Sequence, residues 1–140
     1  MEFADVVAHC RTLAAQIQAR AGPIDGLIGV SRGGWVPARL LSSLLCVKRI
    51  YSIGLEYADA ERKRLVCYDD PAHALVSPSI LLVVEDCLET GRALAFAKEH
   101  LGLRGHTVLT AALFITPRSQ FIPDFHAARL DAPPTFPWEV

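Results

Sequence analysis

Segments with a helical spacing of apolar residues alternate with short, continuous apolar runs along this chain of 140 residues. In residues 2–20 an apolar side chain recurs every three or four positions, which predicts a helix with one buried face. These apolar side chains are Phe3, Val6, Val7, Cys10, Leu13, Ala14 and Ile17. Further helices are predicted over about residues 36–45 and 90–101, and Gly102 ends the second of these.

Four continuous apolar runs are bounded by turn residues and predict buried strands. They cover about residues 27–30, 49–55, 79–84 and 107–114. Because these runs alternate with the helices, we predict an α/β fold with one parallel sheet and helices on both faces. The whole chain, residues 1–140, is assigned to one domain, with a core over about residues 1–114 and a small C-terminal hood over about 115–140. Residues 56–78 mix charges with prolines and are expected to form a surface excursion.

The composition and charge of the chain argue against several classes of function. A net charge of −1 gives no overall field that attracts nucleic acid, so none is expected as a partner. No apolar run approaches the roughly 20 residues that span a bilayer, and the N-terminus has no signal-peptide pattern, so we expect a cytoplasmic location and no membrane contact. The four cysteines contain no Cys-x-x-Cys pair and the five histidines have no metal-ligand spacing. The spacing therefore argues against a zinc site and favours reduced thiols.

The most informative segment is residues 80–94, where a predicted strand ends in Glu85 and Asp86 and is followed by Glu89-Thr90-Gly91. Adjacent carboxylates at the end of a buried strand need cations or hydroxyl groups beside them. The Thr-Gly turn opens a helix, whose free N–H groups and dipole favour an anion. Together these features predict a site for a phosphorylated sugar and a metal ion. The alternative is an ordinary turn in which Thr90 caps the helix.

A second loop, Ser31-Arg32-Gly33-Gly34, also follows a strand and precedes a helix. Its glycines allow close approach of the backbone to a ligand, and its Arg offers a planar fork for phosphate oxygens. Alone, it is equally a glycine turn with a surface Arg. In a parallel sheet, however, ligands bind beyond the carboxyl ends of the strands, so the two loops are expected to be neighbours. We expect them to bind opposite ends of a pentose that carries phosphate groups at both ends.

These motifs resemble a known family. Residues 81–94 are similar to the phosphoribosyl pyrophosphate signature of type I phosphoribosyltransferases: four apolar residues, two acids, two variable positions, then acid-Thr-Gly. Residues 30–38 resemble the pyrophosphate loop of the xanthine-guanine (6-oxopurine) branch, and residues 121–125 and 136–139 resemble its C-terminus. The resemblance implies the α/β fold of that family. It also implies transfer of phosphoribosyl from phosphoribosyl pyrophosphate to a purine-type base, with release of pyrophosphate and Mg²⁺ as cofactor.

The resemblance implies a role for each matched position. Glu85 and Asp86 hold the ribose hydroxyls and, with Glu139, Mg²⁺. Glu89 is the base that accepts a proton from the incoming nitrogen, and Arg32 is the other catalytic residue. The 5′-phosphate is bound by Glu89, Thr90, Gly91, Arg92 and Ala93. Pyrophosphate is bound by Ser31, Arg32, Gly33 and Gly34, with a non-proline cis peptide expected between Arg32 and Gly33.

Several matched positions depart from the family. Glu89 stands where Asp is more frequent, and Ala93 replaces a Thr. The expected nucleobase positions are Thr116, Pro133 and Pro134, where the family more often has Lys, an aromatic residue and an aliphatic residue. The altered base pocket favours a second hypothesis, a non-catalytic regulator that binds phosphoribosyl pyrophosphate or a nucleotide. Glu89 favours the enzyme, because a pure binder needs no acid beside a phosphate. Family members are commonly oligomers, so a homodimer or homotetramer is expected.

Overall fold

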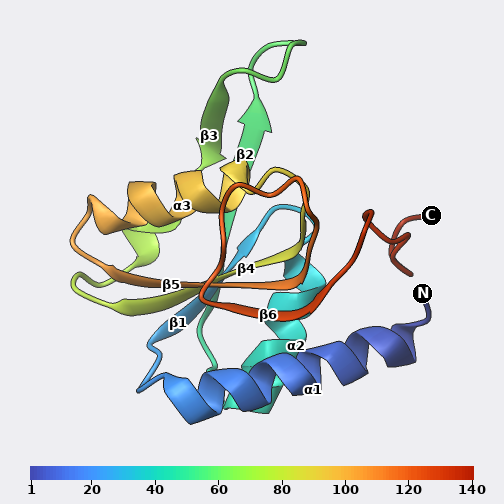
Figure 1. Ribbon diagram of the computed structural model, residues 1–140. Helices are drawn as coiled ribbons and strands as arrows, with labels where there is room; N and C mark the ends of the chain where they lie inside the picture. Colours follow the sequence, from blue (N-terminus) through green and yellow to red (C-terminus); the bar gives the residue numbers. More distant parts are fainter.

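A six-stranded sheet with the strand order β3-β2-β1-β4-β5-β6 carries helices on both of its faces (Figure 1). The structure is a computed structural model and describes residues 1–140. Its elements are α1 (Phe3–Arg20), β1 (Gly26–Val30), α2 (Trp35–Leu45), β2 (Ile50–Tyr57), β3 (Leu65–Asp69), the 3₁₀-helix η1 (Pro71–Ala74), β4 (Ile80–Leu88), α3 (Arg92–Gly102), β5 (Thr107–Ile115) and β6 (Phe125–Arg129). All neighbouring strands are parallel except β2 and β3. The predicted α/β fold is confirmed.

The two faces of the sheet are covered by different helices. Val6, Leu13 and Leu41 bring α1 and α2 onto one face, where they join the cluster around Phe114. Leu94, Ala97 and Leu101 bring α3 onto the other face. Every residue of β1 is buried, because this strand lies inside the sheet between two helical layers.

Strand β4 is longer than the sequence predicted. It continues through Leu88, which pairs with Ile115 of β5. Glu85 and Asp86 therefore lie within a paired strand, and not in the turn that follows it. Side chains of adjacent strand residues point to opposite faces of a sheet. The longer strand thus sends the two carboxylates in different directions.

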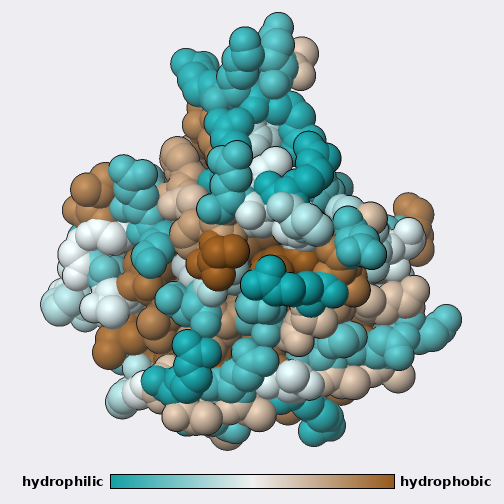
Figure 2. All heavy atoms as spheres, viewed as in Figure 1, coloured by the Kyte–Doolittle hydropathy of each residue, from teal (hydrophilic) through white to brown (hydrophobic).

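The segment expected to be a surface excursion, residues 56–78, contains the end of β2 and all of β3, and these two strands form an antiparallel hairpin that projects from the body of the molecule (Figure 1). Its tip is hydrophilic (Figure 2). The Asp59 carboxylate accepts hydrogen bonds from the N–H groups of Lys63 and Arg64 and so closes the turn. The pairing of β2 and β3 shifts in register between Gly54 and Leu55.

The tail adds a strand that the sequence analysis did not predict. β6 pairs in parallel with β5 at the edge of the sheet. Asp124 holds it there, because its carboxylate accepts hydrogen bonds from the backbone N–H of Thr110 (2.9 Å) and from its hydroxyl (3.0 Å). Phe125 and Phe136 are buried in the core, so the segment expected to form a hood also completes the sheet. None of the helices is both long and apolar enough to span a membrane.

Candidate functional site

Two loops lie at the carboxyl edge of neighbouring strands. β1 and β4 are paired in parallel, and each is followed by a loop that leads into a helix. The first loop, residues 31–34, leads into α2, and the second loop, residues 89–91, leads into α3. The topology thus brings the two sequence motifs to the same edge of the sheet.

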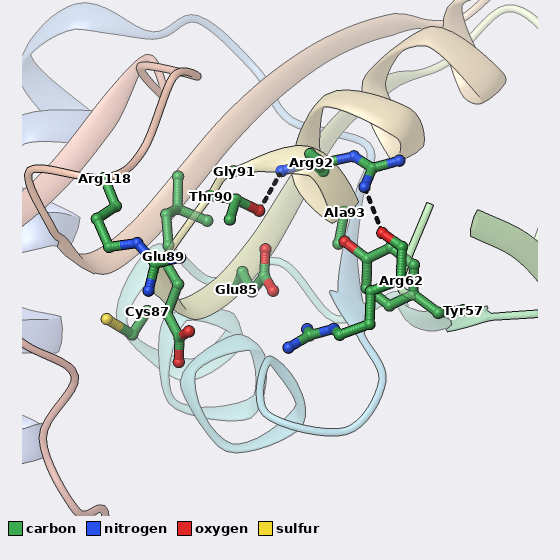
Figure 3. A pocket seen from close by; sticks show the side chains of 11 residues that line it. Tyr57, Arg62, Glu85, Cys87, Glu89, Thr90, Gly91, Arg92, Ala93 and Arg118 are labelled. Atoms are coloured by element: carbon green, nitrogen blue, oxygen red, sulfur yellow. Dashed lines mark hydrogen bonds between the residues drawn. The ribbon is translucent and has the colours of Figure 1, made fainter. Parts of the chain in front are cut away.

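A cavity of about 380 Å³ lies at the N-terminus of α3, and we call it the α3 cavity (Figure 3). Its floor is the second loop, and its walls come from the hairpin and from the loop after β5. The lining residues are Tyr57, Arg62, Glu85, Cys87, Leu88, Glu89, Thr90, Gly91, Arg92, Ala93 and Arg118. Because the backbone N–H groups at the start of a helix have no partners within the helix, this cavity favours an anion.

Gly91 makes the start of α3 possible. Its φ of +80° lies in the left-handed region, which side chains rarely adopt. A Cβ at this position would also lie 2.6 Å from the Cβ of Phe121. The sequence therefore requires glycine where the chain turns from β4 into the helix.

The side chain of Glu85 points into the α3 cavity (Figure 3). The pKa of its carboxyl group is strongly shifted. Its Oε2 is buried and has no hydrogen-bond partner. Burial raises the pKa of Glu85 to about 8, and the nearby carboxylates of Asp86 and Glu89 add to the shift. A carboxylate in this position is stabilised by a cation or a hydrogen-bond donor from a ligand.

Asp86 lines a second, larger cavity of about 880 Å³ between the first loop and the C-terminal tail, which we call the tail cavity. Burial raises the pKa of Asp86, the N–H of Cys87 opposes this shift by donating a hydrogen bond (2.6 Å), and Glu139 adds to it. The other lining residues are Arg32, Gly33, Trp35, Val36, Trp138, Glu139 and Val140. The adjacent acids therefore line different cavities at the same edge of the sheet, and their expected binding of the ribose hydroxyls remains a prediction.

The first loop is packed tightly against β4. A Cβ on Gly34 would overlap the carbonyl oxygen of Val84, and one on Gly33 would overlap the carboxylate of Asp86. The hydroxyl of Ser31 is hydrogen-bonded to that of Ser52 (2.9 Å). The loop contains a non-proline cis peptide, but it lies between Ser31 and Arg32, one residue before the expected position.

Arg92 connects the second loop to the hairpin. Its guanidinium donates hydrogen bonds to the carbonyl oxygens of Arg62 and Lys63, both at 2.7 Å, and lies 5.3 Å from the ring centre of Tyr57 (Figure 3). The side chain of Arg92 is thus engaged by the hairpin, while its backbone N–H belongs to the first turn of α3. This link has no signal in the sequence, because the hairpin and α3 are about 30 residues apart in the chain.

The expected nucleobase residues are not gathered at either cavity. The buried hydroxyl of Thr116 lies within hydrogen-bond distance of the carbonyl oxygens of Leu88 (3.1 Å) and Glu89 (3.2 Å), so it holds the end of β4 to the end of β5. Pro133 and Pro134 line neither the α3 cavity nor the tail cavity. Proline also offers no N–H to a ligand.

Two residues that the sequence analysis did not assign to the site lie in it. Arg118 follows β5 at the carboxyl edge of the sheet and extends beside Glu89 in the α3 cavity (Figure 3). Trp138 lines the tail cavity and stacks on Phe136 with ring centres 4.6 Å apart. The topological rule that identified the two loops also applies to the loop after β5, so it provided a signal for Arg118.

Comparison with known proteins agrees with this architecture. The chain is 25% identical over 140 residues to the xanthine-guanine phosphoribosyltransferase of Gluconobacter oxydans, covering 93% of this chain and 77% of that protein. The purine phosphoribosyltransferase of Pyrococcus horikoshii has a similar structure, with a TM-score of 0.84, 23% identity and coverage of 100% of this chain and 93% of that one. The xanthine-guanine-hypoxanthine phosphoribosyltransferase of Helicobacter pylori gives a TM-score of 0.79 and 19% identity, over 91% and 84% of the two chains. Residues 2–140 match the phosphoribosyl transferase domain, and the protein therefore belongs to that family.

Proposed function

We propose that the protein is a nucleobase phosphoribosyltransferase, which transfers phosphoribosyl from phosphoribosyl pyrophosphate to a purine-type base and releases pyrophosphate. The observation that carries this proposal is the pair of loops at one edge of the sheet, with Glu85 and Asp86 between them. The purine class is supported by the named relatives, which include purine and xanthine-guanine enzymes.

The two loops divide the phosphate groups of the sugar between them. Backbone N–H groups of residues 89–93 bind the 5′-phosphate at the N-terminus of α3, where the helix dipole adds to the attraction. Ala93 contributes only its backbone there. Ser31, Arg32, Gly33 and Gly34 bind pyrophosphate; Arg32 lines the tail cavity, and its guanidinium is the group that would contact phosphate oxygens.

The carboxylates suit a magnesium ion. Asp86 and Glu139 line the tail cavity together with Arg32, and Glu85, the neighbour of Asp86 in β4, has a buried oxygen without a partner at the adjoining α3 cavity. Oxygen ligands of this kind are those that Mg²⁺ prefers. The Oε2 of Glu139 accepts a hydrogen bond from the N–H of Phe136 (2.8 Å), which fixes its carboxylate beside the cavity. Bound there, Mg²⁺ supplies positive charge that offsets the charge on the departing pyrophosphate.

Glu89 and Arg118 act on the incoming base. A nitrogen of the base forms a bond to the anomeric carbon while the bond from that carbon to the pyrophosphate oxygen breaks, and Glu89 accepts the proton that the nitrogen loses. Arg118 lies beside Glu89 and presents only hydrogen-bond donors. It therefore replaces Thr116, whose hydroxyl is already engaged, as the group that recognises an oxygen on the base.

The deciding experiment offers hypoxanthine, guanine, xanthine, adenine and uracil in turn, with phosphoribosyl pyrophosphate and Mg²⁺, and follows the release of pyrophosphate. We expect turnover with at least one oxopurine. The Glu89→Gln variant is expected to lose at least about 100-fold in kcat while keeping its affinity for phosphoribosyl pyrophosphate. Arg118→Gln is expected to raise the KM for the base and to spare that for the sugar.

If no base leads to release of pyrophosphate while phosphoribosyl pyrophosphate binds tightly, the protein would instead be a regulatory binding protein. Unchanged turnover in Glu89→Gln would remove its role in proton transfer. A homodimer or homotetramer and a cytoplasmic location are further parts of this proposal, and light scattering on the purified protein tests the first of them.

A further inference from the structure

Three side chains of different chemistry meet where the end of β3 approaches the last turn of α3. They are Cys67 on β3, Asp70 at the start of η1 and His100 on α3. One sulfur, one carboxylate oxygen and one imidazole nitrogen from these residues all lie within 4.8 Å of one another, and all three residues are partly buried. None of them lines the α3 cavity or the tail cavity.

The local structure holds each of these side chains in place. The Oδ1 of Asp70 accepts a hydrogen bond from the N–H of Ala72 (2.9 Å), while its Oδ2 lies 2.8 Å from the Nε2 of His100. The ring of Phe96 stacks on that of His100 with an angle of 14° between the planes. The register shift in the hairpin leaves Tyr68 as an extra residue between Cys67 and Asp69, and shifts of this kind redirect side chains.

We propose that Cys67, Asp70 and His100 bind one zinc ion. Thiolate, imidazole and carboxylate are the three ligand types that proteins use for zinc, and one thiolate with one carboxylate balances its charge. Zinc–ligand bonds of about 2.0–2.3 Å place tetrahedral donor atoms roughly 3.3–3.8 Å apart, so small side-chain rotations complete the set. Water fills the fourth position.

Spacing along the chain did not reveal this site, because Asp70 and His100 are 30 residues apart and meet only in the folded protein. A metal ion there would fasten the base of the hairpin to the last turn of α3. Arg92 already fastens the tip of the hairpin to the first turn of the same helix. The hairpin, which supplies Tyr57 and Arg62 to the α3 cavity, would then be held at both ends.

Arg104 separates this proposal from its simplest alternative, a set of ion pairs without metal. The Nη2 of Arg104 lies 3.0 Å from the Oδ2 of Asp70, and its side chain is 45% exposed. Because Arg104 pairs with the carboxylate that would bind zinc, its positive charge competes with the metal ion. Its exposed side chain can move into solvent when zinc binds. Removing it in Arg104→Gln should therefore tighten zinc binding, whereas it would only weaken a set of ion pairs.

The test uses the full chain, stripped of metal with a chelator, and titrates it with Zn²⁺ alone by calorimetry and with Co²⁺ in the spectrophotometer. We expect one zinc ion per chain, a rise in Tm on adding zinc, and a thiolate-to-cobalt charge-transfer band. Cys67→Ser should abolish the band, and His100→Gln should lower zinc affinity by more than the about 10–100-fold that the loss of an outer-shell partner costs. Cys46→Ser, which changes an exposed cysteine elsewhere, should leave both signals unchanged.

Cys87→Ser shows which thiol holds the metal, because Cys87 lines the α3 cavity. A cobalt band that survives Cys67→Ser and disappears in Cys87→Ser would overturn the proposal. So would the absence of zinc binding by the wild-type chain, or an Arg104→Gln variant that binds zinc no more tightly than the wild type.

Discussion

The contribution of Glu85 to the stability of the fold depends on pH. Its carboxyl group is buried and lies near the carboxylates of Asp86 and Glu89, so the protonated form is favoured in the folded protein without ligand. In the unfolded chain the same group is exposed to water. The residue is therefore prepared for a cation at the expense of the stability of the ligand-free protein.

This difference predicts a pH dependence of stability. The pKa of Glu85 is raised from 4.5 to about 8, so between these values the folded protein holds a proton that the unfolded chain has lost. The free energy of unfolding should fall as the pH rises through that window. Glu85→Gln should remove this part of the slope in urea denaturation measured between about pH 5 and pH 8. Glu99→Gln, at an exposed position of α3, is the control and should keep the wild-type slope.

Gly34 gives a second prediction for a single residue. A Cβ there would overlap the carbonyl oxygen of Val84, which belongs to a buried backbone and cannot move aside. Gly34→Ala should therefore lower the free energy of unfolding by about 1–3 kcal/mol or more. Gly22→Ala, where a Cβ meets nothing within 4 Å, should leave it nearly unchanged. Equal denaturation midpoints for the two variants would contradict this account of the loop.

At the scale of the elements, the hairpin β2–β3 and the helix α3 together line the α3 cavity. The two guanidinium hydrogen bonds of Arg92 join the tip of the hairpin to the first turn of the helix, so that the hairpin becomes a wall of the α3 cavity. Without that contact the hairpin would project into solvent with only its base attached to the sheet. The hydrogen bonds of Arg92 therefore contribute to the shape of the cavity.

Arg92→Ala should loosen the hairpin. The loss of two hydrogen bonds to a charged group costs about 1–3 kcal/mol of local stability, which corresponds to amide exchange faster by about one to two orders of magnitude. The amides to follow are those of Lys63 and Arg64, which donate to Asp59 in the folded turn. Lys98→Ala removes an exposed cation from the same helix and should leave their exchange unchanged.

The elements with a strong apolar pattern could be predicted from the sequence. The elements that form only by pairing with a distant part of the chain could not. Apolar periodicity located α1 and the buried strands, and the two loops followed from their glycines and acids. β4 extends beyond its apolar run because β5 continues to pair with it, and β6 forms because Asp124 bonds to Thr110. Neither interaction is local in the chain. Arg118 was overlooked for a different reason, because the topological rule was applied to the loops after β1 and β4 and not to the loop after β5.

At the scale of the whole molecule, the two loops are held by different layers. The first loop leads into α2 on one face of the sheet, and the second leads into α3 on the other. A ligand that contacts both loops would connect the two helical layers through the sheet. Binding of such a ligand should thus be measurable as stabilisation of the entire fold.

Phosphoribosyl pyrophosphate with Mg²⁺ should raise the Tm of the protein. At 100 times its Kd, a ligand that binds only the folded state adds about 2.7 kcal/mol, which is several degrees in Tm for a domain of this size. Arg32→Ala should reduce the shift, because it removes the only guanidinium of the first loop. Arg39→Ala removes an exposed cation from α2, outside both cavities, and should retain it. An identical shift in Arg32→Ala would argue that only the second loop binds the sugar.

Residues 1 and 140 lie on the same side of the molecule (Figure 1). The ammonium group of Met1 donates a hydrogen bond to the carbonyl oxygen of Thr135 (3.4 Å), and Val140 lines the tail cavity. An affinity tag fused to Val140 would consequently lie at the tail cavity, which contains Asp86 and Glu139, and one fused to Met1 would lie beside residue 135 of the tail. Kinetic assays should therefore use protein from which tags have been cleaved. A fluorophore attached at residue 140 would report on ligands that enter the tail cavity.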